Sequence, residues 1–77
     1  MLQIKDLKNV LDLHHVPFDE YWLNGGLPMS ECALCIQKKA SHFEVYLVER
    51  NKVLESKLFQ TEDEACKHFL KEFRIAV

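Results

Sequence analysis

Residues 42–59 read HFEVYLVERNKVLESKLF and carry the clearest structural signal in the chain. From His42 to Glu49 the side chains alternate between two faces, as in a β-strand with one packed face, and the apolar face holds Phe43, Val45 and Leu47. The pair Arg50-Asn51 separates this run from a second one, Lys52 to Phe59, at the spacing of a tight hairpin. A shorter run of similar character, Ala33 to Lys38, precedes both. We therefore expect an antiparallel meander of three strands.

The outer face of this sheet is expected to carry charge. Alternate residues of the last run are Leu54, Ser56 and Leu58 on one side and Glu55, Lys57 and Phe59 on the other. With the leucines toward the core, the opposite face presents two charges beside an aromatic ring. Such a face can bind a partner.

Helical periodicity flanks the strands on both sides. Apolar residues recur every three or four positions from Ile4 to His14, and Val16-Pro17 ends that helix because a residue before proline avoids the helical region. Thr61 and Glu64 form a capping box that starts a second helix. The predicted fold is a single α+β domain over residues 1–77: helix, three-stranded antiparallel meander, helix, with both helices on one face of the sheet. Its predicted core contains Leu7, Val10, Leu11, Phe43, Val45, Leu47, Phe69, Leu70 and Phe73.

Composition limits the classes of protein to consider. A chain of 77 residues with 48% hydrophobic content builds one core, and we expect disorder at most in Ile75 to Val77. Ten basic against twelve acidic residues give a net charge of −2, which argues against a broad nucleic-acid-binding surface and suits a basic partner. No run approaches the roughly 20 apolar residues of a membrane span, and the start lacks the layout of a secretory signal. We therefore expect a cytoplasmic protein without a membrane partner.

The cysteines could in principle hold a metal or act as nucleophiles. Their number is odd and no export signal precedes them, so we expect reduced thiols. Cys32 and Cys35 would face opposite sides of a strand, while Cys66 and His68 diverge on a helix, which opposes a zinc site. No third group is placed to orient a cysteine–histidine pair. We expect Cys35 and Cys66 to be small core residues, and predict no metal, no cofactor and no enzymatic activity.

The predicted order of elements matches that of the double-stranded-RNA-binding domain. In that domain the start of the second helix is rich in lysine and contacts phosphates. The corresponding segment here, Gln60 to Lys67, contains three carboxylates, which would repel the RNA backbone. The order of elements thus allows nucleic-acid binding while these charges oppose it. We keep direct binding of nucleic acid as the alternative to protein binding.

The stretch from Asn24 to Phe73 resembles small bacterial immunity proteins encoded beside contact-dependent growth-inhibition and other polymorphic toxins. The residues that carry the likeness are Asn24-Gly25-Gly26-Leu27-Pro28 with Glu31, Glu44-Val45-Tyr46 with Glu49-Arg50, Phe59, Glu62-Asp63-Glu64-Ala65-Cys66 and His68-Phe69-Leu70. This resemblance implies a cytoplasmic inhibitor that binds the C-terminal toxin domain of its own system, in many cases a nuclease acting on tRNA. A regulatory domain that binds a host enzyme would have the same sequence features.

Several aromatic and acidic residues have no predicted position in the core. We take them as the predicted partner site, because mixtures of rings and carboxylates form binding hot spots against basic protein surfaces. One group is the aromatic, acidic segment after the first helix, and the other lies on and beside the strands. The predicted partner-binding residues are Asp19, Glu20, Tyr21, Trp22, Glu31, Glu44, Tyr46, Glu49 and Arg50. The competing interpretation is that Tyr46 covers the sheet and that Glu49 and Arg50 only set the hairpin.

Overall fold

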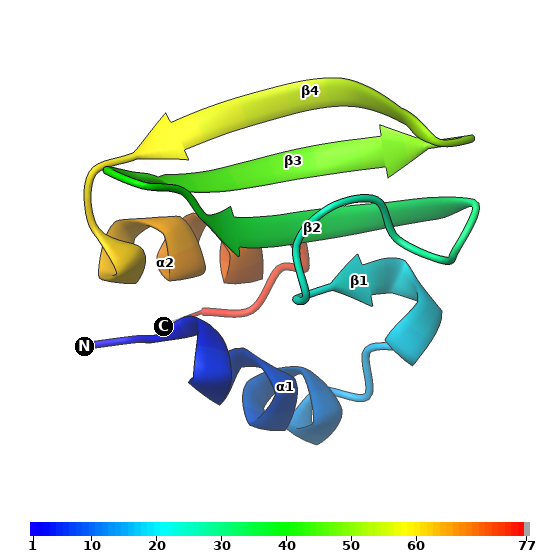
Figure 1. Cartoon of the computed structure of the whole chain (residues 1–77). Coiled ribbons are helices and arrows are strands. Elements are labelled where there is room, and N and C mark those ends of the chain that lie inside the picture. The colour runs from blue at the N-terminus through cyan, green and yellow to red at the C-terminus, as the bar shows by residue number, and fades with distance from the viewer. Residues whose placement is uncertain (77) are drawn as a thin grey trace.

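A computed structural model describes residues 1–76 of the chain. The elements in order are α1 (Ile4–Leu13), η1 (Phe18–Glu20), β1 (Tyr21–Trp22), β2 (Cys32–Lys38), β3 (Phe43–Glu49), β4 (Lys52–Phe59) and α2 (Glu62–Glu72). The four strands form one sheet in the order β1-β2-β3-β4, and both helices lie on the same side of it (Figure 1). The predicted α+β class is confirmed. Neither of the helices in the described part is long and apolar enough to cross a membrane.

The prediction of a purely antiparallel, three-stranded sheet is wrong. The short strand β1 pairs parallel to β2, with Tyr21 opposite Leu34 and Trp22 opposite Cys35, so the sheet is mixed. A strand of two residues is too short to show alternation in a sequence, which is why the pattern gave no sign of it. The rest of the meander has the expected order and close to the expected bounds.

The hairpin between β3 and β4 turns within two residues. Arg50 and Asn51 have φ of 52° and 66°, the left-handed conformations of the turn that matches the twist of paired strands. A β-bulge follows, because Leu47 lies opposite Glu55 while the next residue, Val48, lies opposite Val53. Leu54 is therefore the extra residue of β4.

The main core fills the space between the helices and the sheet. Leu7 and Leu11 of α1 and Phe69 and Leu70 of α2 are fully buried there, as predicted, and Val45 nearly so. Val10, Phe43, Leu47 and Phe73 are only partly buried, and the fully buried Ile36 was missed.

The segment after α2 packs back on this core. Ile75 is 5% exposed, and its amide donates to the carbonyl of Leu70 over 3.1 Å. The expectation of disorder from Ile75 onward is therefore wrong for this residue, and Val77 lies outside the described residues. A sequence window ending at the last helical turn does not reveal that an isoleucine beyond it returns to the core.

The orientation predicted for β4 is inverted. Glu55, Lys57 and Phe59 lie opposite Leu47, Val45 and Phe43, and so share the face that the helices cover. Of β4, only Phe59 packs on the core, because this strand is the sheet edge farthest from the helices (Figure 1). Its leucines project from the other face, and Leu54 and Leu58 are 53% and 58% exposed.

The start of α2 is tied to the start of α1. The carboxylate of Asp63 accepts a hydrogen bond from the amide of Leu2 over 2.8 Å, and that of Glu62 accepts from the amide of Ile4 over 2.7 Å. Thr61 caps α2 as predicted, since its hydroxyl accepts from the amide of Glu64 over 3.2 Å. The carboxylate of Glu64 reaches the threonine hydroxyl, at 2.9 Å. The acidic residues at the start of α2 therefore have structural partners.

Candidate protein-binding site

The rings among the predicted partner residues lie largely inside the protein. Tyr21 and Tyr46 are 8% and 4% exposed, and Trp22 is partly buried. Trp22 packs on a second, smaller cluster on the sheet face away from the helices, where Tyr46 lies with Ala33, Cys35 and Val48. These rings leave little surface for a partner.

Two glycines hold the β1–β2 loop over this second cluster. The hydroxyl of Tyr46 donates to the carbonyl of Gly26 over 2.5 Å, and the indole nitrogen of Trp22 donates to the carbonyl of Gly25 over 2.6 Å. Gly26 in turn donates its amide to Oε1 of Gln37 over 3.3 Å. Both glycines have left-handed φ, 76° and 68°, which other residues rarely adopt. Burial also raises the pKa of Tyr46 to about 12, which keeps the hydroxyl protonated as a donor.

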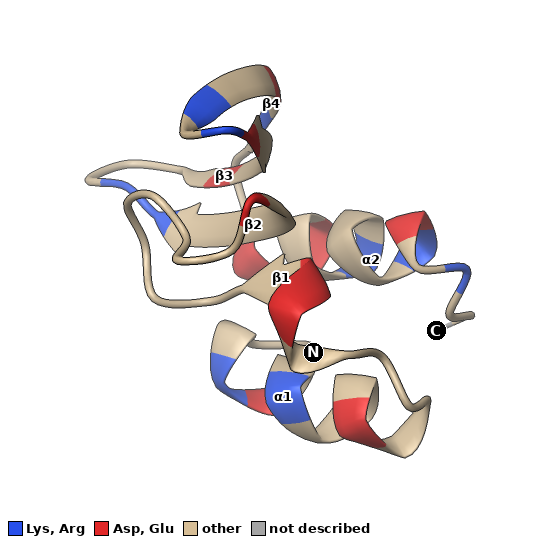
Figure 2. Cartoon of the chain, turned by 90° about the vertical axis from the view of Figure 1, so that its right-hand side faces the viewer, with Lys and Arg blue, Asp and Glu red and all other residues tan. Residues whose placement is uncertain are grey.

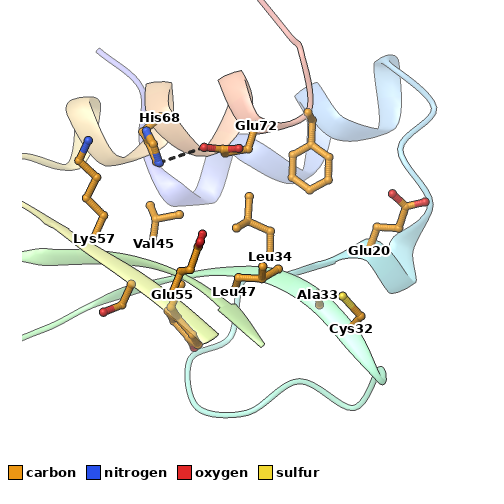
Figure 3. A pocket seen from close by; sticks show the side chains of 13 residues that line it. Glu20, Cys32, Ala33, Leu34, Val45, Leu47, Glu55, Lys57, His68 and Glu72 are labelled. Atoms are coloured by element: carbon orange, nitrogen blue, oxygen red, sulfur yellow. Dashed lines mark ion pairs between the residues drawn. The ribbon is translucent and has the colours of Figure 1, made fainter. Parts of the chain in front are cut away.

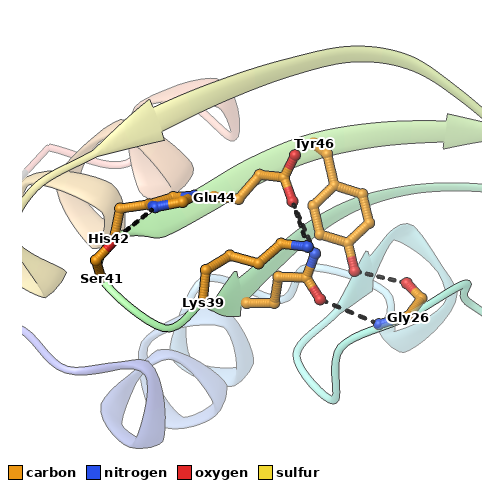
Figure 4. Close-up of polar contacts among 7 residues, drawn as sticks. Gly26, Lys39, Ser41, His42, Glu44 and Tyr46 are labelled. Atoms are coloured by element: carbon orange, nitrogen blue, oxygen red, sulfur yellow. Dashed lines mark hydrogen bonds and ion pairs between the residues drawn. The ribbon is translucent and has the colours of Figure 1, made fainter.

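Glu44 lies beside this network and is largely satisfied within the chain (Figure 4). The amide of Gln37 donates to its Oε1 over 2.7 Å, and Nζ of Lys39 lies 3.8 Å from the same oxygen. Only 17% of its side chain is exposed. The carboxylate of Glu44 is therefore engaged mainly in contacts within the sheet and offers little surface to a partner.

The exposed members of the predicted site gather at one end of the molecule. Asp19 and Glu20 belong to η1, Glu31 precedes β2, Glu49 ends β3, and Arg50 begins the β3–β4 turn. These segments all lie at the right-hand end in Figure 1, and Figure 2 looks onto that end, with the acidic η1 facing the viewer. Arg50 is anchored there, since its amide donates to the carbonyl of Glu31 over 2.7 Å and its Nε lies 3.6 Å from Oε1 of Glu31.

A groove of about 720 Å³ opens near this end, between the sheet and the C-terminal half of α2. It extends from β4 across β3 and β2 to η1, and its lining includes the partly buried Leu34, Leu47 and Phe73. Figure 3 shows Glu20 at one end of the groove and Lys57 at the other, with Glu55 and Glu72 between them on opposite walls. The groove thus combines an apolar lining with charged walls.

Negative charge prevails in the groove. Glu20, Glu55 and Glu72 line it together with a single lysine, Lys57. Nε2 of His68 lies 3.3 Å from Oε1 of Glu72, and its ring lies against Phe59 with 5.1 Å between centroids. An apolar groove with carboxylates around it fits a lysine or arginine side chain, whose stem is apolar and whose end is cationic.

Most of this groove was not recognised from the sequence. Glu20 and Tyr46 were predicted as partner residues, whereas the remaining groove residues were not. The alternation along Lys52 to Phe59 did separate Glu55 and Lys57 from the leucines, but assigned them to the wrong face. Glu72 carried a signal in its i, i+4 spacing from His68, which places both side chains on one side of α2.

The groove does not bring a cysteine and a histidine together. Cys32 lies at the opposite end from His68 in Figure 3, and among the residues described no hydrogen bond joins a cysteine to a histidine. Burial raises the pKa of Cys35 to about 11 and that of Cys66 to about 12, which disfavours their thiolates. Within residues 1–76 no three histidine, cysteine or acidic side chains are placed to hold a metal ion.

The chain was compared with known proteins on sequence and on structure. No protein-family model matches it, and no curated protein and no solved structure matches it either.

Proposed function

We propose that this protein is an immunity protein that binds the C-terminal toxin domain of its own system through the acidic groove between α2 and β4. The observation that carries the proposal is the composition of that groove: three glutamates around an apolar lining of Leu34, Leu47 and Phe73. Binding sites on proteins combine such an apolar centre with a polar rim that selects the partner by charge.

A nuclease that acts on RNA, including tRNA, is the toxin class that fits this groove best. Its active-site cleft has to be basic, because the substrate is a chain of phosphates. Carboxylates at the mouth of an apolar groove can occupy positions that phosphates would take, while the lining holds the stem of a lysine or arginine. Inhibition would follow from blocking access of RNA to the cleft, with no chemistry by the inhibitor.

Co-expression with the protein domain encoded directly beside this gene, as the immunity proposal requires of its toxin, tests the proposal. We expect the tagged protein to co-purify with that toxin domain, and cells carrying the toxin to survive only when this protein is present. A complex without rescue would favour regulation of another enzyme, and binding of duplex RNA by the isolated protein would favour the double-stranded-RNA-binding alternative. Either result would contradict the immunity proposal.

Charge reversal locates the interface within the molecule. Glu20→Lys and Glu72→Lys change groove residues that are exposed and lie outside the core, so both variants should fold. We expect each to slow association with the toxin domain about five- to tenfold at low salt, with a smaller effect at high salt. Asp12→Lys carries the same change in net charge on the exposed side of α1 and is the control. Equal effects of all three variants would exclude the groove as the contact surface.

A further inference from the structure

The strand β4 is an open edge of the sheet. It is the longest of the strands described, eight residues, and no element within residues 1–76 pairs with the side that faces away from β3 (Figure 1). Three of its large apolar side chains, Val53, Leu54 and Leu58, are more than half exposed. Soluble proteins ordinarily shorten, cover or break such an edge, because its unpaired backbone groups invite another strand.

Symmetry limits how two copies could pair along this edge. An antiparallel pair of identical strands in a continuous sheet has its twofold axis perpendicular to the sheet, so each face of one copy continues into the same face of the other. Residues opposite each other across the axis then project to the same side. The axis therefore lies midway between the two copies of one residue of β4. The residues near the centre of the strand that could take this position are Glu55, Ser56 and Lys57.

Charge distinguishes these three registers. An axis at Glu55 places the two Glu55 side chains against each other, and an axis at Lys57 does the same with two lysines, and both arrangements are destabilising. An axis at Ser56 places Glu55 of each copy opposite Lys57 of the other, twice. The same register places Leu54 opposite Leu58 on the outer face, also twice. From Glu55 to Phe59, β4 pairs residue for residue with β3, so the two Glu55–Lys57 pairs lie on the regular part of the edge, and Leu54 is the bulge residue next to it.

We propose that two copies of this protein associate through β4, antiparallel and with Ser56 on the twofold axis, to form a continuous eight-stranded sheet. The two Glu55–Lys57 pairs set the register, and the Leu54–Leu58 contacts bury apolar surface that is exposed in the single chain. Because the axis preserves the faces, the two acidic grooves open on the same side of the dimer. The proposal does not depend on the identity of the partner that the groove binds.

Sedimentation equilibrium of three variants tests the pairing. Glu55→Lys places two lysines opposite each other at both symmetric positions, and we expect it to raise the dimer dissociation constant at least about tenfold. The double exchange of Glu55→Lys with Lys57→Glu restores opposite charges and should restore the dimer. Asp19→Lys makes the same change in net charge as Glu55→Lys, on η1 beside the other edge of the sheet, and should leave the dimer unchanged.

Hydrogen exchange of the β4 amides provides a readout that does not depend on the variants. In the wild-type protein at high concentration, the amides of β4 that point away from β3 should be protected, and dilution should remove this protection. A wild-type protein that stays monomeric up to about 1 mM, in the millimolar range where the weakest associations are seen, would overturn the proposal. A double exchange that folds but does not restore the dimer would also overturn it.

Discussion

Tyr46 connects the small outer cluster to a loop that is distant in the sequence. Its ring belongs to the small outer cluster, and its hydroxyl donates to the carbonyl of Gly26, twenty residues earlier. Tyr46→Phe keeps the ring and removes the donor, so we expect the free energy of unfolding to fall by about 1 kcal/mol, the usual net value of one hydrogen bond. Urea denaturation measures the change. A variant as stable as the wild type would mean that the loop is held without this bond.

The three thiols should differ sharply in reactivity. Cys32 is exposed, whereas Cys35 and Cys66 are buried and have raised pKa values of about 11 and 12. At pH 8 the native protein should therefore react with a disulfide reagent at Cys32 alone, and at all three cysteines after denaturation. Mass spectrometry of the labelled protein identifies the sites. Labelling of Cys66 in the native protein at the rate of Cys32 would contradict the packing of α2.

The two helices depend on each other through Asp63 at the start of α2. The amide of Leu2 and, after it, the ammonium of Lys67 hold the pKa of this carboxyl below its ordinary value of 3.8. A carboxyl with a lower pKa in the folded chain stabilises that chain fully above its unfolded pKa, and the effect is lost as the pH falls through the lower folded value. Asp63→Asn should therefore lower the melting temperature at pH 7. The difference from the wild type should shrink as the pH falls below the ordinary value of 3.8.

Asp12 offers a matched control for that experiment. It pairs with Lys8 over 2.9 Å at the same i, i+4 spacing that joins Asp63 to Lys67 over 3.0 Å, with the acidic residue second in the pair instead of first. Of the two carboxylates, only that of Asp63 also accepts a backbone amide from the segment that leads into the other helix. Asp12→Asn should therefore cost less stability at pH 7 than Asp63→Asn. Equal losses would show that the ion pair alone, and not the contact between helices, accounts for the effect.

The segment that follows α2 contributes to the core through Ile75. This side chain is 5% exposed, so Ile75→Ala should remove about 2 to 4 kcal/mol from the free energy of unfolding, as truncations of buried isoleucines do. Leu13→Ala removes a similar side chain that is 77% exposed, and should change stability by less than about 0.5 kcal/mol. Chemical denaturation of both variants tests this. Similar small losses would mean that the segment is not docked.

Across the whole molecule, local sequence patterns predicted most of the helices and strands, whereas long-range contacts determine how these elements pair. The start of α2 and its threonine cap followed from a capping-box pattern, and β3 and β4 followed from alternation and a two-residue turn. The parallel strand β1 did not follow, because Tyr21-Trp22 gains its place from pairing with residues thirteen positions on. Periodicity is a property of one segment and does not say which other segment it will meet.

The candidate site was predicted only in part, because its residues too are brought together by long-range contacts. Glu20 was chosen for its charge, and it does line the groove. Trp22 and Tyr46 were chosen as unplaced rings, but the glycine carbonyls that hold them lie in a loop whose course no sequence pattern reveals. Glu55 was placed on the wrong face, since the usual rule that leucines point to the core does not hold on an edge strand of which only Phe59 reaches the core.

The carboxylates of Glu62 and Asp63 have a consequence for how the chain is made. They accept hydrogen bonds from the amide of Ile4, the first residue of α1, and from that of Leu2, just before it, across separations of 58 and 61 residues. During synthesis the N-terminal segment leaves the ribosome before these acceptors have been added. A helix of ten residues is marginal by itself in water. We therefore expect α1 to stay only partly formed on the ribosome until α2 has emerged, so that this domain completes its fold only after α2 has been synthesised.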